Sequence, residues 1–346
     1  MALGWGIVGI GSHPDLKVAP AMQVANGSEL VAVCGRDQGR SDAFAESHGA
    51  KAAYTDLNDL LRDSRVDAVF VASPNSLHAP QSIQSASAGK HVLSEKPMAI
   101  TVEDAVAMVR ACRRKGVKLG IGFELRFHPA HLFARELVFQ GAIGRIRLAQ
   151  GQWARGERGA TEHLPRTGLR EWWEQPELVG DASVMMGMGV HVFDLMRFML
   201  AEDAVEVVAM TDGQTARQPL EHIASISLRM SAGTIASVLC GRLLPDTQND
   251  FAIYGSDGRI TGNETIWEGR FGKAEVVSAA VNRTETFQYD YLANFVDELE
   301  DFSDAVERDR DPRATGLDGL FATLTTAAAV ESARTGHAVK VVPVDV

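Results

Sequence analysis

The chain has 346 residues, of which 45% are hydrophobic, and its formal net charge is -11 at pH 7. A chain of this length and apolar content is too long for one small core, so we expect two folded domains. The negative charge would repel nucleic acid and anionic membranes, because binding a phosphate backbone requires clustered cations. We therefore expect neither partner and attribute the charge to ordinary solubility.

The N-terminal segment and the cysteines indicate the compartment. Residues 1–11 lack the basic flank and cleavage site of a signal peptide, and glycines interrupt the apolar run well before membrane-spanning length. Cys34, Cys112 and Cys240 are scattered without a C-x-x-C spacing, which argues against a disulfide framework or a thiolate metal site. We expect a cytoplasmic protein in a reducing environment.

From Trp5 to Gly122, short β-branched apolar runs alternate with segments of helical period, which is typical of parallel strands joined by crossover helices. Strands are predicted over Trp5–Gly9, Leu30–Cys34, Ala52–Tyr54, Ala68–Ala72, Val92–Ser94 and Val117–Ile121. Helices are predicted near Val18–Asn26, Arg40–His48, Leu57–Asp63, Ala79–Ala88 and Val102–Lys115. Asp56 is expected to cap the third helix, and Thr101 with Asp104 the fifth.

After Gly122 the pattern changes, and a second domain is predicted. Helices are expected over Pro129–Gln140, Val190–Leu200, Leu292–Glu307 and Phe321–Thr335, and a strand from Ile146 into Trp153. The runs Val205–Met210, Ile223–Met230, Thr234–Leu239 and Phe251–Tyr254 alternate with the period of an antiparallel sheet with one covered face, and a hairpin turn is expected at 231–233. Residues 155–170, rich in Gly, Arg and Glu, form either a mobile connection or a loop over a ligand.

The first strand ends in Gly9-Ile10-Gly11, where glycines allow a tight turn and a close approach to a pyrophosphate. The third glycine of the usual G-x-G-x-x-G is replaced by Pro14, so we expect the turn to be lengthened by about a residue before a helix at Val18. A glycine turn without a nucleotide remains an alternative at this stage.

The end of the second strand indicates which dinucleotide would bind. Gly35 stands where an NAD enzyme would place a carboxylate against the ribose, and Arg36 and Arg40 could hold a 2′-phosphate and stack on adenine. This pattern favours NADP over NAD. Asp37 could either cap the next helix or compete for the ribose, and Arg36 could be a solvated surface residue.

Polar residues follow the next two parallel strands, at the edge where ligands bind in open α/β sheets. Strand four leads into Ser73-Pro74-Asn75 and on to His78, and strand five into Ser94-Glu95-Lys96-Pro97. Taken alone, Lys96 could be a surface lysine paired with its neighbour.

These segments, in this order and spacing, resemble the Gfo/Idh/MocA family of oxidoreductases. The resemblance extends through Arg126-Phe127-His128-Pro129, Gly141-x-Ile143-Gly144 and Gly187-x-Gly189-x-His191-x-x-Asp194 to Thr335-Gly336, and so covers essentially the whole chain. It implies a Rossmann domain over residues 1–123, followed over 124–346 by an α/β domain with a large, mostly antiparallel open sheet that often forms subunit contacts. The C-terminal helix of such a chain can pack back on the first domain.

The resemblance also implies roles for single residues. Lys96 matches the lysine that binds and polarises the reacting oxygen, His191 matches the proton donor or acceptor, and the Lys96–Pro97 bond is expected to be cis. A cation suits this chemistry because hydride transfer to a carbonyl develops negative charge on oxygen. The residues predicted to bind the cofactor are Gly9, Gly11, Ser12, Gly35, Arg36, Arg40, Ser73, Pro74, Asn75, His78, Glu95, Lys96, Pro97 and Arg126.

One departure from the family pattern concerns the position four residues before His191. The family commonly has Asp there, whereas this chain has Gly187. Asp194, Asp181 or Glu124 could replace the missing carboxylate, although each is individually more typical of a capping or surface residue.

Further residues fall where contacts to a sugar are expected, because aromatic faces and forked cations suit its ring and hydroxyl groups. The predicted substrate residues are Lys96, Arg126, Trp153, Arg155, His163, Trp172, Trp173, His191 and Asp194. His128, His131 and His163 offer no second close ligand pair, so we predict no metal site.

The leading interpretation is an enzyme that moves a hydride between NADP(H) and a CH–OH or C=O carbon of a sugar, polyol or glycoside, and that works as a homodimer or homotetramer. A non-catalytic NADP-binding regulator of the same fold is the main alternative. A reductase of non-sugar carbonyls is another. The sequence leaves the substrate and the direction of the reaction undefined.

Overall fold

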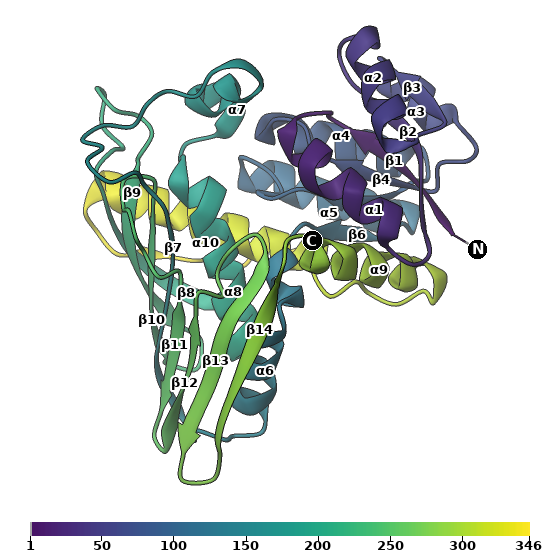
Figure 1. Cartoon of the computed structure of the whole chain (residues 1–346). Coiled ribbons are helices and arrows are strands. Elements are labelled where there is room, and N and C mark those ends of the chain that lie inside the picture. The colour runs from purple at the N-terminus through teal and green to yellow at the C-terminus, as the bar shows by residue number, and fades with distance from the viewer. Residues whose placement is uncertain (1) are drawn as a thin grey trace.

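A computed structural model describes residues 2–346 and contains two sheets (Figure 1). The first is a parallel six-stranded sheet in the order β3-β2-β1-β4-β5-β6, which confirms the predicted Rossmann-type architecture. Its strands are β1 (Leu3–Val8), β2 (Ser28–Cys34), β3 (Ala52–Tyr54), β4 (Ala68–Val71), β5 (His91–Ser94) and β6 (Leu119–Ile121). The order reverses between β1 and β4, and the loops after these strands therefore diverge and open a crevice.

The crossover helices are α1 (Ala19–Val24), α2 (Gln38–His48), α3 (Leu57–Arg62), α4 (Asn75–Ser87) and α5 (Val102–Lys115). The predicted caps are confirmed: the side chain of Asp56 accepts from the amide of Asn58, and Thr101 accepts from the amide of Asp104. Each satisfies an amide that the first helical turn leaves free.

The expected longer turn before the first helix is wrong. Helical backbone already begins at Ser12, and a π-helical turn, η1 (Pro14–Val18), leads directly into α1. The wider turn absorbs the extra residue inside the helix, and Pro14 is tolerated because the first turn needs no amide from it. The helix α4 likewise starts at Asn75, earlier than predicted, and so directly follows the loop after β4.

The second sheet has nine strands in the order β14-β13-β12-β11-β7-β10-β9-β8-β15. All its pairs are antiparallel except β7 with β10, which confirms the mostly antiparallel sheet. The strands are β7 (Ile146–Ala154), β8 (Ala204–Thr211), β9 (Ile223–Met230), β10 (Ile235–Gly241), β11 (Phe251–Gly255), β12 (Gly258–Asn263), β13 (Arg270–Ser278), β14 (Asn282–Asp290) and β15 (Val339–Lys340). The predicted hairpin turn is confirmed, with Gly233 at a φ of 93°.

The sequence pattern missed β12, β13 and β14. Most side chains of β14 are exposed, so this strand carries little of the apolar alternation that marks a half-buried strand. Its pairing with β13 is decided by the neighbouring strand and not by a local apolar pattern.

The remaining helices are η2 (Glu124–Phe127), α6 (Pro129–Phe139), η3 (Gly168–Glu174), α7 (Pro176–Val179), η4 (Met185–Gly189), α8 (Val190–Leu200), α9 (Ala293–Glu307) and α10 (Gly316–Thr335). The helix α9 packs on α1, and α10 contacts both α5 and β8, so the last two helices return to the first sheet (Figure 1). A bridge between Gly120 and Thr315 joins the start of α10 to β6.

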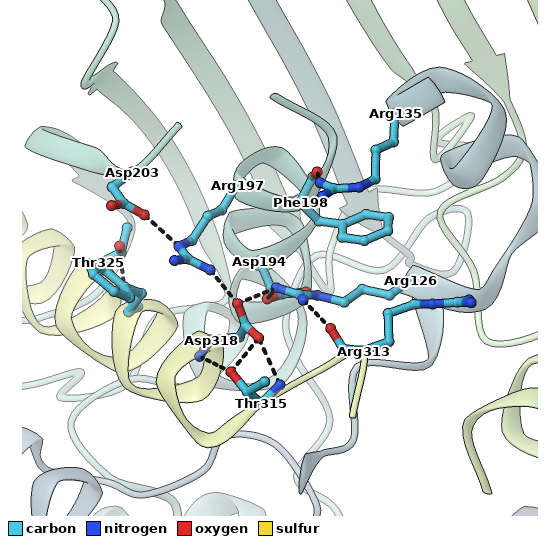
Figure 2. Close-up of polar contacts among 11 residues, drawn as sticks. Arg126, Arg135, Asp194, Arg197, Phe198, Asp203, Arg313, Thr315, Asp318 and Thr325 are labelled. Atoms are coloured by element: carbon cyan, nitrogen blue, oxygen red, sulfur yellow. Dashed lines mark hydrogen bonds and ion pairs between the residues drawn. The ribbon is translucent and has the colours of Figure 1, made fainter. Parts of the chain in front are cut away.

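A buried ion-pair network joins η2, α8 and α10 (Figure 2). Arg126 donates from Nε and Nη2 to the two carboxylate oxygens of Asp194, at 2.8 and 2.6 Å, and its Nη2 also lies 3.0 Å from Asp318. Asp318 in turn caps α10 by accepting from the amide and hydroxyl of Thr315 and pairs with Arg197. Three elements distant in sequence are thereby fixed to one guanidinium.

Replacing Asp194 with Ala should lower the free energy of unfolding by about 3 kcal/mol, because it removes the bidentate partner of an arginine that is only 4% exposed. Chemical denaturation would measure the change. The control is Arg158→Ala, which breaks a solvent-exposed pair with Asp246 and should change the stability by less than about 1 kcal/mol. Equal effects of the two substitutions would contradict a structural role for the network.

Candidate active site

The loop after β1 allows a ligand to approach its backbone closely. Gly9 has a φ of 93°, and a Cβ there would lie 2.7 Å from the backbone of Ala72 and Ser73. A Cβ on Gly11 would meet nothing within 4 Å. Gly9 is therefore required by the turn itself, whereas Gly11 leaves open space beside the start of a helix, where free amides and the helix dipole favour a phosphate. These residues fit the pyrophosphate of a dinucleotide.

The residues after β2 leave the surface beside this loop positively charged. Asp37 accepts from the amide of Arg40 at 2.8 Å and so caps α2, which is one of the two roles that the sequence left open for it. The Arg40 guanidinium donates to the Ile10 carbonyl at 3.4 Å, and Arg36 is exposed. A Cβ at Gly35 would collide with Ile10, so packing also requires this glycine.

His78 joins the loops that follow β4 and β5. The buried imidazole has Nδ1 2.8 Å from the Pro97 carbonyl oxygen and Nε2 2.8 Å from the Ser73 carbonyl oxygen. Asn75 is also buried and donates to the carbonyl of Val179 in α7, across the junction between the two parts of the chain. Both side chains hold the loop backbones in place.

The Glu95 carboxylate at the end of β5 is held by two neighbours. It lies 2.7 Å from Nε2 of His13 and accepts from the backbone amide of Lys96 at 3.2 Å. Burial alone would raise the pKa of Glu95, but His13 and the Lys96 charge outweigh it and hold the pKa at about 2. Glu95 is thus a fixed negative charge next to the backbone of Lys96.

Lys96 reaches from the first sheet to the second part of the chain. Its Nζ donates to the carbonyl of Gly187 at 3.4 Å, in the turn that leads into α8. The Lys96–Pro97 peptide bond is cis, as expected.

His191, at the start of α8, is only 2% exposed and has Glu124 as its nearest carboxylate. The distance from its Nδ1 to the Glu124 carboxylate is 3.5 Å, and its ring packs against Trp153 with centroids 4.5 Å apart. Burial, followed by the positive charge of Lys96, lowers the pKa of His191 well below its usual range. Burial also raises the pKa of Glu124 to about 8, so the pair is electrically neutral at neutral pH with its proton on Glu124.

A cleft of about 230 Å³ runs from the glycine loop to the tryptophans of η3, with Lys96 on its wall. It is lined by Gly11, Ser12, His13, Pro14, Leu16, Lys17, Ala72, Ser73, Asn75, His78, Glu95, Lys96, Arg155, Arg166, Leu169, Arg170, Trp172, Trp173, Glu268 and Tyr291. A smaller inner cavity of about 80 Å³ shares Lys96, Arg155, Arg166, Trp173 and Glu268 and adds Trp153, Gly187, Met188, Arg242 and Trp267.

Eleven of the predicted site residues line the cleft or the inner cavity: Gly11, Ser12, Ser73, Asn75, His78, Glu95, Lys96, Trp153, Arg155, Trp172 and Trp173. The predicted cofactor residues Gly9, Gly35, Arg36, Arg40, Pro74 and Pro97 line neither, and nor do four of the predicted substrate residues. Arg126 and Asp194 bind each other in the network of Figure 2 and line neither the cleft nor the inner cavity. His163 lies in a neighbouring pocket, 3.2 Å from Glu174. His191 lies behind Trp153, which does line the inner cavity.

Of the three carboxylates considered as substitutes for the missing Asp, Glu124 is the one beside His191. Asp194 is bound to Arg126, and the exposed Asp181 lies 3.5 Å from Arg334.

Several residues of the cleft were not anticipated. They are His13, Lys17, Arg166, Arg170, Arg242, Glu268 and Tyr291. The buried Lys17 pairs with Glu268 and lies over the rings of Tyr291 and Phe295. The composition of 155–170 gave a hint of Arg166 and Arg170, and these residues make the segment a wall of the cleft. No sequence signal marked Arg242, which follows a strand of the second sheet.

Within residues 2–346, no group of three or more His, Cys, Asp or Glu side chains is arranged to hold a metal ion. The helices of the same range include none that is both long and apolar enough to cross a membrane.

Comparisons with known proteins cover both parts of the chain. A family model described as "Oxidoreductase family, NAD-binding Rossmann fold" matches residues 3–123, and one described as "GFO/IDH/MocA C-terminal domain" matches residues 131–261. The 1,5-anhydro-D-fructose reductase of Ensifer adhaerens is 31% identical over 97% of this chain and 98% of its own length. The D-xylose 1-dehydrogenase (NADP(+)) 2 of Haloferax volcanii is 30% identical over 97% of this chain and 99% of its own.

Among solved structures, an aldose-aldose oxidoreductase from Caulobacter crescentus complexed with glycerol superposes with a TM-score of 0.87 at 26% identity. The superposition covers 98% of this chain and 100% of that chain.

Proposed function

Because the chain belongs to the Gfo/Idh/MocA family of oxidoreductases, we propose that it transfers a hydride between NADP(H) and a CH–OH or C=O carbon of a sugar, polyol or related carbohydrate. The observation that carries this proposal is the position of Lys96. Its ammonium group borders both the cleft that begins at the glycine loop and the tryptophan-lined inner cavity.

The dinucleotide would be held by Gly9, Gly11 and Ser12 at the pyrophosphate and by Arg36 and Arg40 at the 2′-phosphate. When bound, its nicotinamide supplies or accepts the hydride. NADP is favoured because the Asp37 carboxylate is engaged as a helix cap, the Arg40 guanidinium reaches the Ile10 carbonyl of the glycine loop, and Arg36 is exposed.

Lys96 is proposed to contact the reacting oxygen. As a carbonyl is reduced, negative charge develops on its oxygen, and an ammonium group at that position stabilises the charge and can donate a proton. The Glu95 carboxylate holds the backbone amide of Lys96, and the Gly187 carbonyl accepts a hydrogen bond from its ammonium group.

His191 and Glu124 are proposed to act behind Lys96 as the acid/base pair that returns the proton. Burial keeps His191 from direct contact with the cleft, and its nearest carboxylate holds a proton at neutral pH. Glu124 thereby takes the positioning role of the carboxylate that is absent at Gly187.

A carbohydrate would lie between Lys96 and the aromatic wall formed by Trp153, Trp172 and Trp173. Trp172 and Trp173 stack with centroids 4.4 Å apart and present flat apolar surface, which suits the CH-rich face of a sugar ring.

We also propose a homodimer or homotetramer that uses the open face of the second sheet. On this face Tyr254, Leu148 and Ile235 are register partners on three adjacent strands, and Val208 and Met210 of β8 are exposed as well. An exposed apolar row of this kind is typical of a protein–protein contact. A cytoplasmic location is supported by Cys34, Cys112 and Cys240, which are free and buried.

The test of the proposed function is turnover of a panel of pyranoses, inositols, keto-sugars and glycosides, with NADP and NAD in parallel. Lys96→Ala should lower kcat/KM for the active substrate by at least about 100-fold, because it removes the cation at the reacting oxygen. Dinucleotide affinity, followed by nicotinamide fluorescence, should change little. A dinucleotide that binds while no substrate is ever turned over would instead favour the regulator.

Arg36→Ala should raise KM for NADP by about tenfold or more and leave KM for NAD nearly unchanged, because one charge-assisted contact to the 2′-phosphate is lost. Arg62→Ala serves as the control, since Arg62 lies in the same domain and is exposed in an ion pair with Asp59. If both cofactors respond equally to Arg36→Ala, the assignment to NADP is wrong.

Glu124→Gln should change both the pH profile and the pH dependence of stability. A carboxyl whose pKa rises from 4.5 to about 8 on folding stabilises the folded state fully below pH 4.5, and this contribution is lost as the pH rises to 8. A permanently neutral glutamine avoids the loss, so the free energy of unfolding of the variant, relative to wild type, should increase between pH 5 and pH 9.

The same variant should lose the transition near pH 8 in kcat/KM that ionisation of Glu124 gives the wild type. Thermal melts at both pH values and the kinetic profile test the two effects separately. Stability differences that are identical at pH 5 and pH 9 would contradict a protonated Glu124.

A further inference from the structure

Three arginines gather around the inner cavity. Arg155, Arg166 and Arg242 line it together with Lys96, and the guanidinium carbons of Arg166 and Arg242 lie 4.8 and 5.5 Å from the centroid of the Trp173 ring. The one carboxylate on the wall is Glu268, which is already paired with Lys17. The cavity therefore has four cationic groups and one neutralised acid.

None of these arginines has a carboxylate partner, and they differ in burial: Arg242 is buried, Arg166 is partly buried and Arg155 is exposed. In the described chain, residues 2–346, no carboxylate lies within 4.0 Å of the guanidinium groups of Arg155, Arg166 and Arg242. The nearby Glu174 is turned toward His163 and the backbone amide of Arg166. Buried cations are otherwise paired, because burying an uncompensated charge costs several kcal/mol.

Of the three arginines, Arg242 gives the strongest evidence for an anion-binding site. It is 8% exposed, its Nη1 donates to the hydroxyl of Ser183 at 2.6 Å, and its buried Nε has no hydrogen-bond partner. A neutral hydroxyl satisfies one donor of the guanidinium but none of its charge. The guanidinium is thus arranged as part of an anion-binding site whose anion the protein itself does not supply.

The mutual repulsion of these arginines also supports an anion-binding site. Burial and then the neighbouring arginines lower the pKa of Arg166 to about 9 and that of Arg242 to about 10. Glu174 and Glu221 act in the opposite direction on Arg242 but do not cancel the effect. An anion in the cavity would compensate for the desolvation of the guanidinium groups and would offset their mutual repulsion.

Gly187 is what leaves the site open to an anion. A Cβ at this position would point at the Trp173 ring, 3.3 Å from Cζ3, and would lie 3.6 Å from Nη2 of Arg242. An aspartate there would bring a carboxylate next to Arg242. With glycine, the carbonyl of residue 187 contacts Lys96 and no side chain from this position enters the inner cavity.

The phosphates of the dinucleotide are not the partners of Arg242. Gly11, Ser12 and Ser73 of the phosphate-binding end line the larger cleft, as do Arg155 and Arg166, whereas Arg242 lines the inner cavity and not this cleft. An anionic group bound in the inner cavity belongs to the molecule that Lys96 acts on.

We propose that the substrate is an anionic sugar derivative whose carboxylate or phosphate is bound by Arg155, Arg166 and Arg242 in the inner cavity, in the space that Gly187 leaves free. The inference rests on the proposed function, since it names the class of substrate for the same site. Arg242 and Arg166 hold the anion against Trp173, and this anchor presents the carbon to be oxidised or reduced to Lys96.

Direct binding tests the proposal without requiring turnover. The wild-type protein is titrated with D-glucuronate, D-gluconate, D-glucose 6-phosphate and neutral D-glucose, with and without NADP, and tryptophan fluorescence and calorimetry are followed. At least one of the acids or the phosphate should bind roughly tenfold to a hundredfold more tightly than D-glucose, as expected for charged hydrogen bonds. Which of them binds best distinguishes a carboxylate from a phosphate.

A matched pair of variants isolates the charge. Gly187→Asp and Gly187→Asn introduce side chains of nearly equal size, but the aspartate alone supplies the missing negative charge. The Asp variant should lose the preference for the anionic sugars, by at least about tenfold relative to the Asn variant. Arg242→Gln should lose it as well. The control Arg158→Gln, which removes an exposed ion pair with Asp246 in the segment that carries Arg155 and Arg166, should bind as wild type does.

The inference is overturned if D-glucose binds as tightly as every anionic probe, or if the Asp and Asn variants bind the anions equally. Anionic sugars that bind without any change in nicotinamide absorbance would support this site while counting against the proposed hydride transfer. Turnover of a neutral sugar with no binding of the anions would support the enzyme and refute the anionic substrate.

Discussion

The geometry of the candidate site depends on the hydrogen bonds of the Arg126 guanidinium group. This group binds Asp194 on α8, Asp318 at the start of α10 and the carbonyl of Arg313, while lying itself just beyond the first sheet. Because these partners are buried, their positions are fixed by hydrogen bonds that water cannot replace. The helix α8 is thereby held in the orientation that places His191 beside Glu124 and the preceding turn beside Lys96.

The net charge of the whole molecule and the charge of its candidate site have opposite signs. The chain as a whole carries an excess of negative charge, yet the inner cavity is cationic. Beside Lys96 the sign of the charge is reversed, because the preceding residue, Glu95, is buried and ionised. A substrate anion would thus be attracted to one side of Lys96 and repelled from the other, which orients it in the cleft.

The two carboxyl groups under Lys96 show how environment separates like groups. Glu95 has His13 and a backbone amide as partners and remains ionised, whereas the group nearest to the Glu124 carboxyl is a neutral imidazole and Glu124 retains its proton. Both are buried, so the difference comes from the partners and not from the degree of burial. One group can therefore serve as a fixed charge and the other as a source of a proton.

The sequence by itself determined the features that depend on neighbouring residues: the parallel strands, the helix caps at Asp56 and Thr101, and the glycine turn at Gly9. Motif spacing also indicated the family and the lysine. Only the tertiary structure decided that Glu124 is the nearest carboxyl group to His191, that Arg126 and Asp194 bind each other, and that Arg242 and Lys96 line the same inner cavity. These pairings join distant segments, and a buried charge takes whichever partner the packing brings within reach, which no local pattern encodes.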